Sequence, residues 1–145
     1  INQYSTNPNS SESILLENDQ IIKDAFSFDT VEEIFNKCEL ISSSGNEFIK
    51  SQLDELKHKS PTSLKISLRQ IRSASKMSLK DELIMEYRMV QKCVEIGDFF
   101  EGVRAMLVEK DRKPAWNPSN IKEIDDDKVN KFFESLGDQD LILTK

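Results

Sequence analysis

The run of sequence that decides the fold class begins with a serine and a proline and reads Ser60-Pro61-Thr62-Ser63-Leu64-Lys65-Ile66-Ser67-Leu68-Arg69-Gln70-Ile71-Arg72-Ser73. Serine favours the N-cap of a helix, and proline fits the next position because the N–H that it lacks would have no helical partner there. Apolar residues then recur three and four positions apart, at Leu64, Leu68 and Ile71, which is the spacing of one helical face. We therefore predict a helix that is capped by Ser60 and runs to roughly Ser73.

Similar signals continue in both directions along the chain. Asp29 with Glu32 three residues later resembles a capping box, Ser78 precedes the longest apolar-periodic stretch, and Gly137 is a typical residue after a helix end. The sequence has no sustained strand alternation and no repeat period. We therefore predict an all-α fold of six or seven amphipathic helices. The predicted helices cover residues 11–26, 29–40, about 48 to just before 60, 60–73, 78–96, 98–110 and 126–136, with loops at 42–46 and 111–118.

Length and composition indicate one domain. The chain has 145 residues, of which 37% are apolar and 32% charged, a balance typical of amphipathic helices with solvated faces. Residues 1–11 are polar and rich in turn-forming types, so we expect a loose N-terminal segment before a helical domain of residues 12–145. Nothing near Ile1 resembles a signal or transit segment, so we expect a processed product or a fragment whose targeting information lay upstream.

The net charge of −6 argues against nucleic-acid binding, because that affinity comes mainly from neutralising phosphates with cations. No apolar run approaches the length of a membrane span, so we expect no membrane insertion. Cys38 and Cys93 match no metal or redox spacing, and His58 has no second histidine with which to share a metal. We therefore predict reduced, buried thiols, a histidine at the surface near a helix end, and no metal site.

Four motifs, read in order, resemble a known enzyme family. They are Ser60-Pro61-Thr62-Ser63-Leu64-Lys65-Ile66, then Glu86-Tyr87-Arg88-Met89, then Asp98-Phe99-Phe100-Glu101-Gly102-Val103-Arg104-Ala105, then Glu109-Lys110-Asp111-Arg112-Lys113-Pro114-Ala115-Trp116. Together they resemble the C-terminal region of the 3-hydroxyisobutyryl-CoA hydrolases, a branch of the crotonase superfamily. The resemblance is strong from about residue 29 to the end and thin before that.

The resemblance implies a function for the parent enzyme and none for this chain alone. Members of that family hydrolyse the thioester of 3-hydroxyisobutyryl-CoA in valine breakdown, usually in mitochondria, and coenzyme A enters only as part of the substrate. By this analogy the catalytic residues lie upstream of Ile1, and the helices pack on the catalytic core, help to close the acyl-CoA site and contribute to subunit contacts. The chain has no Gly-Gly pair and no Gly-rich loop to form an oxyanion hole. We therefore assign no catalytic, cofactor-binding or metal-binding residue and expect the chain alone to be inactive.

Two features allow a functional and a structural interpretation. The first is a basic stripe on the helix after Pro61, at positions i, i+4, i+7 and i+11, formed by Lys65, Arg69, Arg72 and Lys76. This stripe either attracts the phosphates of CoA or is a solvated face that pairs with acids, and we favour the second. The other is Glu86, which falls within the apolar arc of its helix. We interpret it as a structural ion pair with Arg104 in preference to a catalytic acid.

Further expectations concern the region after residue 97. Gly102 lies mid-helix, which requires either a close approach by another backbone or helix or simple tolerance near a helix start. Trp116, between two prolines, is expected to pin its loop onto the helices in preference to stacking on adenine. The helix from Asp98 to Lys110 is apolar nearly all round, so its second face needs a partner, and we expect the chain either to self-associate there or to show the face bare. Two alternatives stay open, namely a helical scaffold of crotonase ancestry and a crotonase of different specificity such as a hydratase.

Overall fold

The computed structural model describes residues 13–96 and 98–143, and within these ranges it contains helices and no strand. The all-α prediction is therefore confirmed. The α-helices are α1 (Ile14–Glu17), α2 (Asp19–Phe26), α3 (Val31–Ser43), α4 (Glu47–Lys57), α5 (Pro61–Ala74), α6 (Leu79–Ile96), α7 (Asp98–Val103) and α8 (Asp126–Asn130). A π-helix spans Arg104–Val108, and short 3₁₀ helices span Ile121–Glu123 and Gly137–Gln139. The loose segment predicted for residues 1–11 lies outside the described residues.

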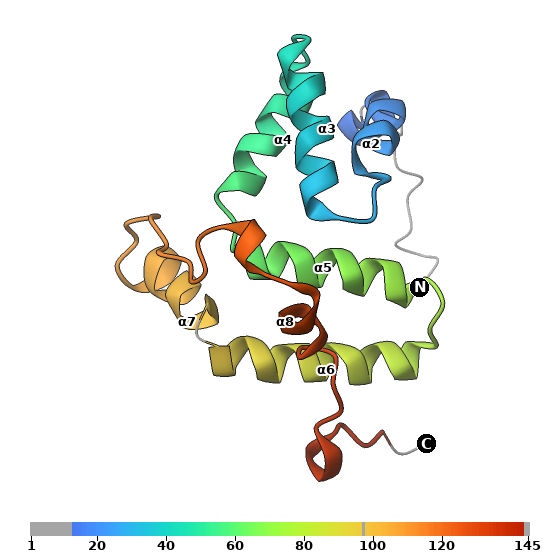
Figure 1. The fold of residues 1–145 in the computed structure, drawn as a ribbon, viewed down its shortest axis with the longest axis vertical. Coiled ribbons are helices and arrows are strands. Elements are labelled where there is room, and N and C mark those ends of the chain that lie inside the picture. The colour runs from blue at the N-terminus through green and yellow to red at the C-terminus, as the bar shows by residue number, and fades with distance from the viewer. Residues whose placement is uncertain (1–12, 97, 144–145) are drawn as a thin grey trace, which may run out of the picture.

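The helix α5 lies at the centre of the molecule, with α2 to α4 on one side and α6 and α8 on the other (Figure 1). It begins as predicted. The Ser60 hydroxyl accepts a hydrogen bond from the Ser63 N–H at 3.1 Å, and Pro61 occupies the first turn. Ile66 on α5 is buried. One well-capped amphipathic helix therefore serves both halves of the fold.

A first apolar cluster lies among α2, α3 and α4. Its buried members are Ala25, Ile34, Cys38, Ile49 and Leu53. The side chains of α3 and α4 that point toward each other are spaced three and four residues apart, so each helix contributes one face and leaves the other to water. As predicted, the thiol of Cys38 is free and fully buried, and it lies in this cluster.

A second apolar cluster fills the space among α5, α6 and α8. It is formed by Ile66, Met85, Met89, Ile124, Val129 and Phe132. The short α8 lies between α5 and α6 (Figure 1), which agrees with the shared burial of these side chains. The acidic C-terminal segment therefore supplies core residues despite its charge.

One predicted helix start was wrong, and one stretch predicted as a single helix is divided in two. The cap of α3 is Thr30, whose hydroxyl accepts from the Glu33 N–H at 3.2 Å while Glu33 accepts from the Thr30 N–H, so the capping box is one residue later than the Asp29–Glu32 pair that we predicted. Thr30 has the extended backbone that a cap requires, with φ −119° and ψ 149°. The first predicted helix is divided at Asn18, whose side chain donates to the Ile14 carbonyl at 2.8 Å and competes with the backbone ladder.

The last predicted helix is also shorter than expected, because α8 ends at Asn130 and the chain continues in turns. Arg88 on α6 holds Asp140 through two hydrogen bonds of 2.7 and 2.6 Å, and Ser135 donates to the same carboxylate. These contacts favour a turn over a continued helix. Gly137 does adopt the left-handed conformation (φ 62°), but it begins a 3₁₀ helix and does not cap α8.

Candidate docking surface

The stretch predicted as one helix from Asp98 to Lys110 changes type part-way. It is α-helical from Asp98 to Val103 and π-helical from Arg104 to Val108, closed by a bond from the Glu109 N–H to the Arg104 carbonyl at 2.8 Å. The wider π turn changes which residues share a face. Ala105 is fully buried, whereas five large apolar side chains face outward. We call these five the α7 apolar surface: Phe99, Phe100, Met106, Leu107 and Val108.

The α7 apolar surface is bare in the structure, with each side chain 51–70% exposed. A second set of exposed apolar residues runs along α6 at positions i, i+4, i+11 and i+15. We call it the α6 stripe: Leu79, Leu83, Val90 and Val94. Scattered exposed apolar residues are ordinary, but aligned ones on consecutive helices mark an interaction surface. This part of the chain therefore has the composition of a docking surface.

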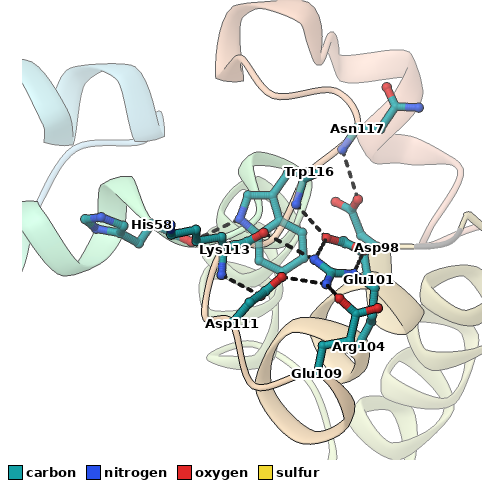
Figure 2. Close-up of polar contacts among 10 residues, drawn as sticks. His58, Asp98, Glu101, Arg104, Glu109, Asp111, Lys113, Trp116 and Asn117 are labelled. Atoms are coloured by element: carbon teal, nitrogen blue, oxygen red, sulfur yellow. Dashed lines mark hydrogen bonds and ion pairs between the residues drawn. The ribbon is translucent and has the colours of Figure 1, made fainter.

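An arginine-centred cluster determines the shape of the segment that follows the π-helix (Figure 2). Arg104 donates to both carboxylate oxygens of Glu101, at 2.8 and 2.7 Å, and to Asp111 at 2.7 Å. It also donates to Glu109 and to the Lys113 carbonyl. A single guanidinium thus binds one residue of the preceding helix and three positions of the following loop. We call this set the Arg104 cluster.

Two carboxylates of the Arg104 cluster, Glu101 and Asp111, stay ionised well below neutral pH. The hydrogen bond from Arg104, aided by the Ala115 N–H at 2.6 Å, lowers the pKa of Glu101 to about 2. Hydrogen bonds from Arg104 and from the Lys113 N–H also lower the pKa of Asp111, and the same contacts raise the pKa of Arg104. The ion pairs of Arg104 with Glu101 and Asp111 are therefore present at physiological pH.

The loop next to this cluster has an alternating arrangement. Residues 109, 111 and 113 each bind the Arg104 guanidinium. The two residues between them, Lys110 and Arg112, are exposed and adopt left-handed backbone conformations, with φ 57° and 56°. A non-glycine residue in that region costs roughly 1–2 kcal/mol. The ion pairs offset that cost, so the loop conformation depends on Arg104.

Trp116 fastens the far end of the loop, as predicted. Its indole Nε1–H donates to the His58 carbonyl at 3.0 Å (Figure 2). His58 itself lies exposed at the end of α4, also as predicted. The close neighbour of Gly102 is this indole and not another backbone or helix, because a Cβ at Gly102 would lie 3.4 Å from the ring. Asp98 also holds this loop in place. Its carboxylate accepts hydrogen bonds from the Ser60 hydroxyl at 2.6 Å and from the Asn117 N–H at 3.2 Å.

The predicted ion pair between Glu86 and Arg104 was wrong. Glu86 is half-buried and accepts a hydrogen bond from the Gln70 side chain of α5 at 2.7 Å. Arg104 is instead occupied by the acids close to it in sequence. The motif Glu101-x-x-Arg104, with acids at 109 and 111, is the signal in the sequence from which the Arg104 cluster could be predicted.

The basic stripe of α5 holds the two halves of the fold together. Lys65 pairs with Glu32 of α3 at 2.6 Å and donates to the Ile124 carbonyl at 2.6 Å. Arg69 binds the Asn130 side chain and stacks over Phe133 at 4.4 Å from the ring centroid. Arg72 donates to the Phe26 and Phe28 carbonyls at 3.2 and 2.9 Å, while Lys76 is exposed. Among the described residues, Lys65 alone of the four pairs with an acid, so the stripe has a structural role, but its partners are mostly neutral amide and carbonyl groups and not the acids that we predicted.

The cavity beside this stripe, of about 470 Å³, is a poor match to phosphates. Lys65, Arg69 and Arg72 line it, but so do three carboxylates, Asp29, Glu32 and Asp126. The charges balance, so the cavity has no net positive charge with which to attract the phosphates of CoA.

Both cysteine side chains are at least partly buried, and Cys38 is fully buried in the first apolar cluster. Cys93 is half-buried and free, and burial raises the pKa of both cysteine thiols, which favours the neutral form. Within residues 13–96 and 98–143, no group of three or more His, Cys, Asp or Glu side chains is arranged to hold a metal ion. None of the helices in the described part is long and apolar enough to cross a membrane.

Comparison with known proteins agrees with this geometry. A sequence profile described as "Enoyl-CoA hydratase/isomerase" matches residues 1–133. The chain belongs to the enoyl-CoA hydratase/isomerase family. Among the similar members, 3-hydroxyisobutyryl-CoA hydrolase, mitochondrial, of Mus musculus is 46% identical over 120 residues, which cover 83% of this chain and 30% of the relative. The Bos taurus protein of the same name is 45% identical over 128 residues, covering 88% and 32%.

A solved structure of this family has the same fold. A carnitinyl-CoA dehydratase from Mycobacterium thermoresistibile matches with a TM-score of 0.83 and 28% identity, covering 94% of this chain and 38% of that one. The resemblance to 3-hydroxyisobutyryl-CoA hydrolases and the crotonase superfamily is thus confirmed. The chain spans about a third of the length of the curated relatives that it matches.

Proposed function

We propose that this chain is the C-terminal helical region of a 3-hydroxyisobutyryl-CoA hydrolase, an acyl-CoA thioester hydrolase of valine catabolism. The observation that carries the proposal is the 42–46% identity to hydrolases of that name over 83–91% of the chain. These relatives are named as mitochondrial, so we also propose a mitochondrial location. Coenzyme A takes part only as the carrier of the acyl substrate.

The proposed role of the chain is to pack against the catalytic region and to close the acyl-CoA site. Two observations support this role. The α7 apolar surface and the α6 stripe are exposed, and the relatives are about three times as long as the matching segment. The rest of such an enzyme is the partner that would cover these side chains, and each large apolar side chain gains roughly 1.5–3 kcal/mol when fully buried. The Arg104 cluster would keep the surface in one shape before docking.

A chimera tests the role directly. The aligned segment of the Mus musculus relative is replaced by this chain, and release of free CoA from 3-hydroxyisobutyryl-CoA is measured. We expect the chimera to be active. We expect Leu107→Asp to reduce soluble yield and activity at least tenfold, because the charge would be buried against the catalytic region.

The chain offers a matched control for this experiment. Leu40 on α3 has the same exposure as Leu107, 67%, and lies outside both exposed apolar sets. Leu40→Asp should leave the chimera unchanged. An inactive parent chimera would contradict the proposed function. Equal losses for the two variants would show that neither apolar set is a specific docking surface.

The chain alone should not catalyse the reaction, because oxyanion stabilisation requires donors that converge on one point. At micromolar concentration it should release CoA from 3-hydroxyisobutyryl-CoA no faster than buffer does. Turnover that survives purification and disappears in Glu86→Gln would assign catalysis to Glu86 and overturn this view.

A different acyl-CoA specificity is the second candidate function. It is favoured by the structural match to a carnitinyl-CoA dehydratase, although that identity is 28% against 42–46% for the hydrolases. A protein that carries this chain and hydrates an enoyl-CoA faster than it hydrolyses 3-hydroxyisobutyryl-CoA would establish it. The third possibility, a scaffold without catalysis, requires that the gene product contain no catalytic region, which the mass of the native protein would show.

A further inference from the structure

A cavity of about 280 Å³ lies where the start of α5, the end of α6 and α8 meet, apart from both exposed apolar sets. Its floor is apolar and includes Ile96, Ile124 and Phe132, of which the last two belong to the second apolar cluster. Three lysines, one from α6, one from α8 and one directly after α8, line it as well: Lys92, Lys128 and Lys131. An apolar floor with a few converging polar groups is the usual composition of a small-molecule site.

Basic side chains outnumber acidic ones in the lining of this cavity. Residues 123–140 contain seven acids and two lysines, and both lysines line the cavity while none of the seven acids does. The one acid among the lining residues is Glu95, which pairs with Lys92 at 2.6 Å. Lys128 and Lys131 therefore leave a local excess of two positive charges in a chain of net charge −6. A field of that sign attracts an anion.

Two polar groups of the lining have no partner in the described part of the chain. Lys128 donates to the Glu123 carbonyl at 2.6 Å, but no hydrogen bond or ion pair joins Lys131 to any described residue. Thr62 is 7% exposed and lines the same cavity, and its hydroxyl likewise has no hydrogen bond to a described residue. No buried side-chain nitrogen or oxygen of the described residues lacks a partner, so this hydroxyl is open to the cavity, where it is free to donate to a ligand or to water.

We propose that this cavity binds a small organic anion, with a carboxylate or phosphate head held by Lys131 and Thr62 and a short apolar body on Ile96, Ile124 and Phe132. The volume corresponds to roughly nine water molecules at about 30 Å³ each, which accommodates a body of about six carbons. The site is independent of the proposed hydrolase function, since it includes neither the α7 apolar surface nor the α6 stripe.

Titration of the isotope-labelled chain, followed by NMR, tests the proposal. The probes are hexanoate and hexyl phosphate, with hexanol and hexylammonium as controls of equal length. We expect either anion to shift the amides of residues 128–132 and the methyl groups of Ile96 and Ile124, and we expect the controls to shift them far less. Whichever anion binds more tightly identifies the head group, and both results support the site.

Matched variants distinguish binding in this cavity from non-specific electrostatic attraction of the anion to surface lysines. Lys131→Gln should weaken anion binding about threefold to tenfold, since a solvent-facing ion pair contributes up to about 1 kcal/mol or somewhat more when a hydrogen bond is added. Lys131→Arg should restore it. Lys122→Gln removes an exposed lysine that does not line the cavity and should have no effect. The proposal is overturned if neither anion shifts these signals, if hexanol binds equally well, or if Lys122→Gln weakens binding as much as Lys131→Gln does.

Discussion

At the scale of single residues, Arg104 organises more of the chain than any other described side chain of the docking region. It reaches Glu101 within its own helical segment and Glu109, Asp111 and Lys113 in the loop beyond. A lysine has one ammonium group and lacks the planar fork that binds both oxygens of Glu101. The loop conformation, including its two left-handed residues, therefore depends on a guanidinium at this position.

The Arg104 cluster predicts a specific dependence of stability on pH. Because the pKa of Glu101 is lowered to about 2 and that of Asp111 is also lowered, both carboxylates stabilise the folded chain above their unfolded pKa values of about 4. That contribution should be lost as the pH falls from about 5 towards about 2. Urea unfolding at pH 7, 4 and 3 should show a smaller acid-induced loss for Arg104→Gln than for the unmodified chain.

The control for this measurement is Arg112→Gln, which changes an exposed arginine of the same loop that contacts none of these acids in the described structure. It should keep the acid dependence of the unmodified chain. Identical dependences for Arg104→Gln and the unmodified chain would show that the ion pairs add nothing to stability.

Gly102 and Trp116 give a second prediction at this scale. A Cβ at position 102 would meet the indole at 3.4 Å, an ordinary contact distance, so Gly102→Ala should be tolerated. It should stabilise the chain by up to about 1 kcal/mol through helix propensity. Gly102→Leu should displace the ring from its bond to His58 and cost about 1–3 kcal/mol. Because the chain has one tryptophan, fluorescence during urea unfolding reports both effects. An unshifted emission maximum in Gly102→Leu would contradict the contact.

At the scale of elements, α5 connects the two apolar clusters. Its cations bind α3, the carbonyls after α2, and α8, while its N-cap residue Ser60 binds Asp98 at the start of α7. The other helices contact fewer neighbours by polar groups. A change at α5 should therefore affect both halves of the molecule.

Alanine substitutions of the two N-cap serines, Ser60 of α5 and Ser78 of α6, test how much the wider contacts of α5 add to stability. Ser60→Ala removes the cap of α5 and the donor to Asp98 from a site that is nearly fully buried, and should cost about 2 kcal/mol. Ser78→Ala removes the same type of cap from the exposed start of α6, and should cost about 0.5–1 kcal/mol. Urea unfolding measures both. Equal costs would mean that the bond between Ser60 and Asp98 contributes nothing.

At the scale of the whole molecule, the described part of the chain combines two buried apolar clusters with bare apolar surface on α6 and α7. The clusters stabilise the helices internally, while the α7 apolar surface and the α6 stripe have no cover in the described structure. Exposed sets of this kind favour association with whatever apolar surface is available. In isolation, the available partner is another copy of the same chain.

We therefore predict that the isolated chain self-associates through the α7 apolar surface. Sedimentation over a concentration series should show the average mass rising from that of one chain towards that of two. Phe100→Asp should keep the chain monomeric, whereas Leu40→Asp, which changes an apolar residue on α3 that is at least as exposed, should not. A strictly monomeric unmodified chain would contradict the prediction and would favour a self-contained scaffold domain.

The sequence by itself determined the features that depend on residues close together in the chain. Helical periodicity predicted the all-α class, and the caps at Ser60 and Ser78 marked two helix starts, because a cap depends on a side chain and an N–H three residues away. The sequence also favoured a fastening role for Trp116 over stacking on adenine, and its indole does bind the His58 carbonyl at the end of α4. The start of α3 was misplaced by one residue, because Asp29 and Thr30 are both suitable caps.

Only the tertiary structure decided which side chains meet across long sequence separations. The partner of Glu86 is Gln70 and not Arg104, and Lys65 reaches Ile124 across 59 residues. The cavity near Lys131 and Thr62 likewise combines three segments that no periodicity relates. The physical reason is that local propensity specifies where a helix lies in the chain. Which of several oppositely charged or polar groups come within 3 Å depends on how the helices pack.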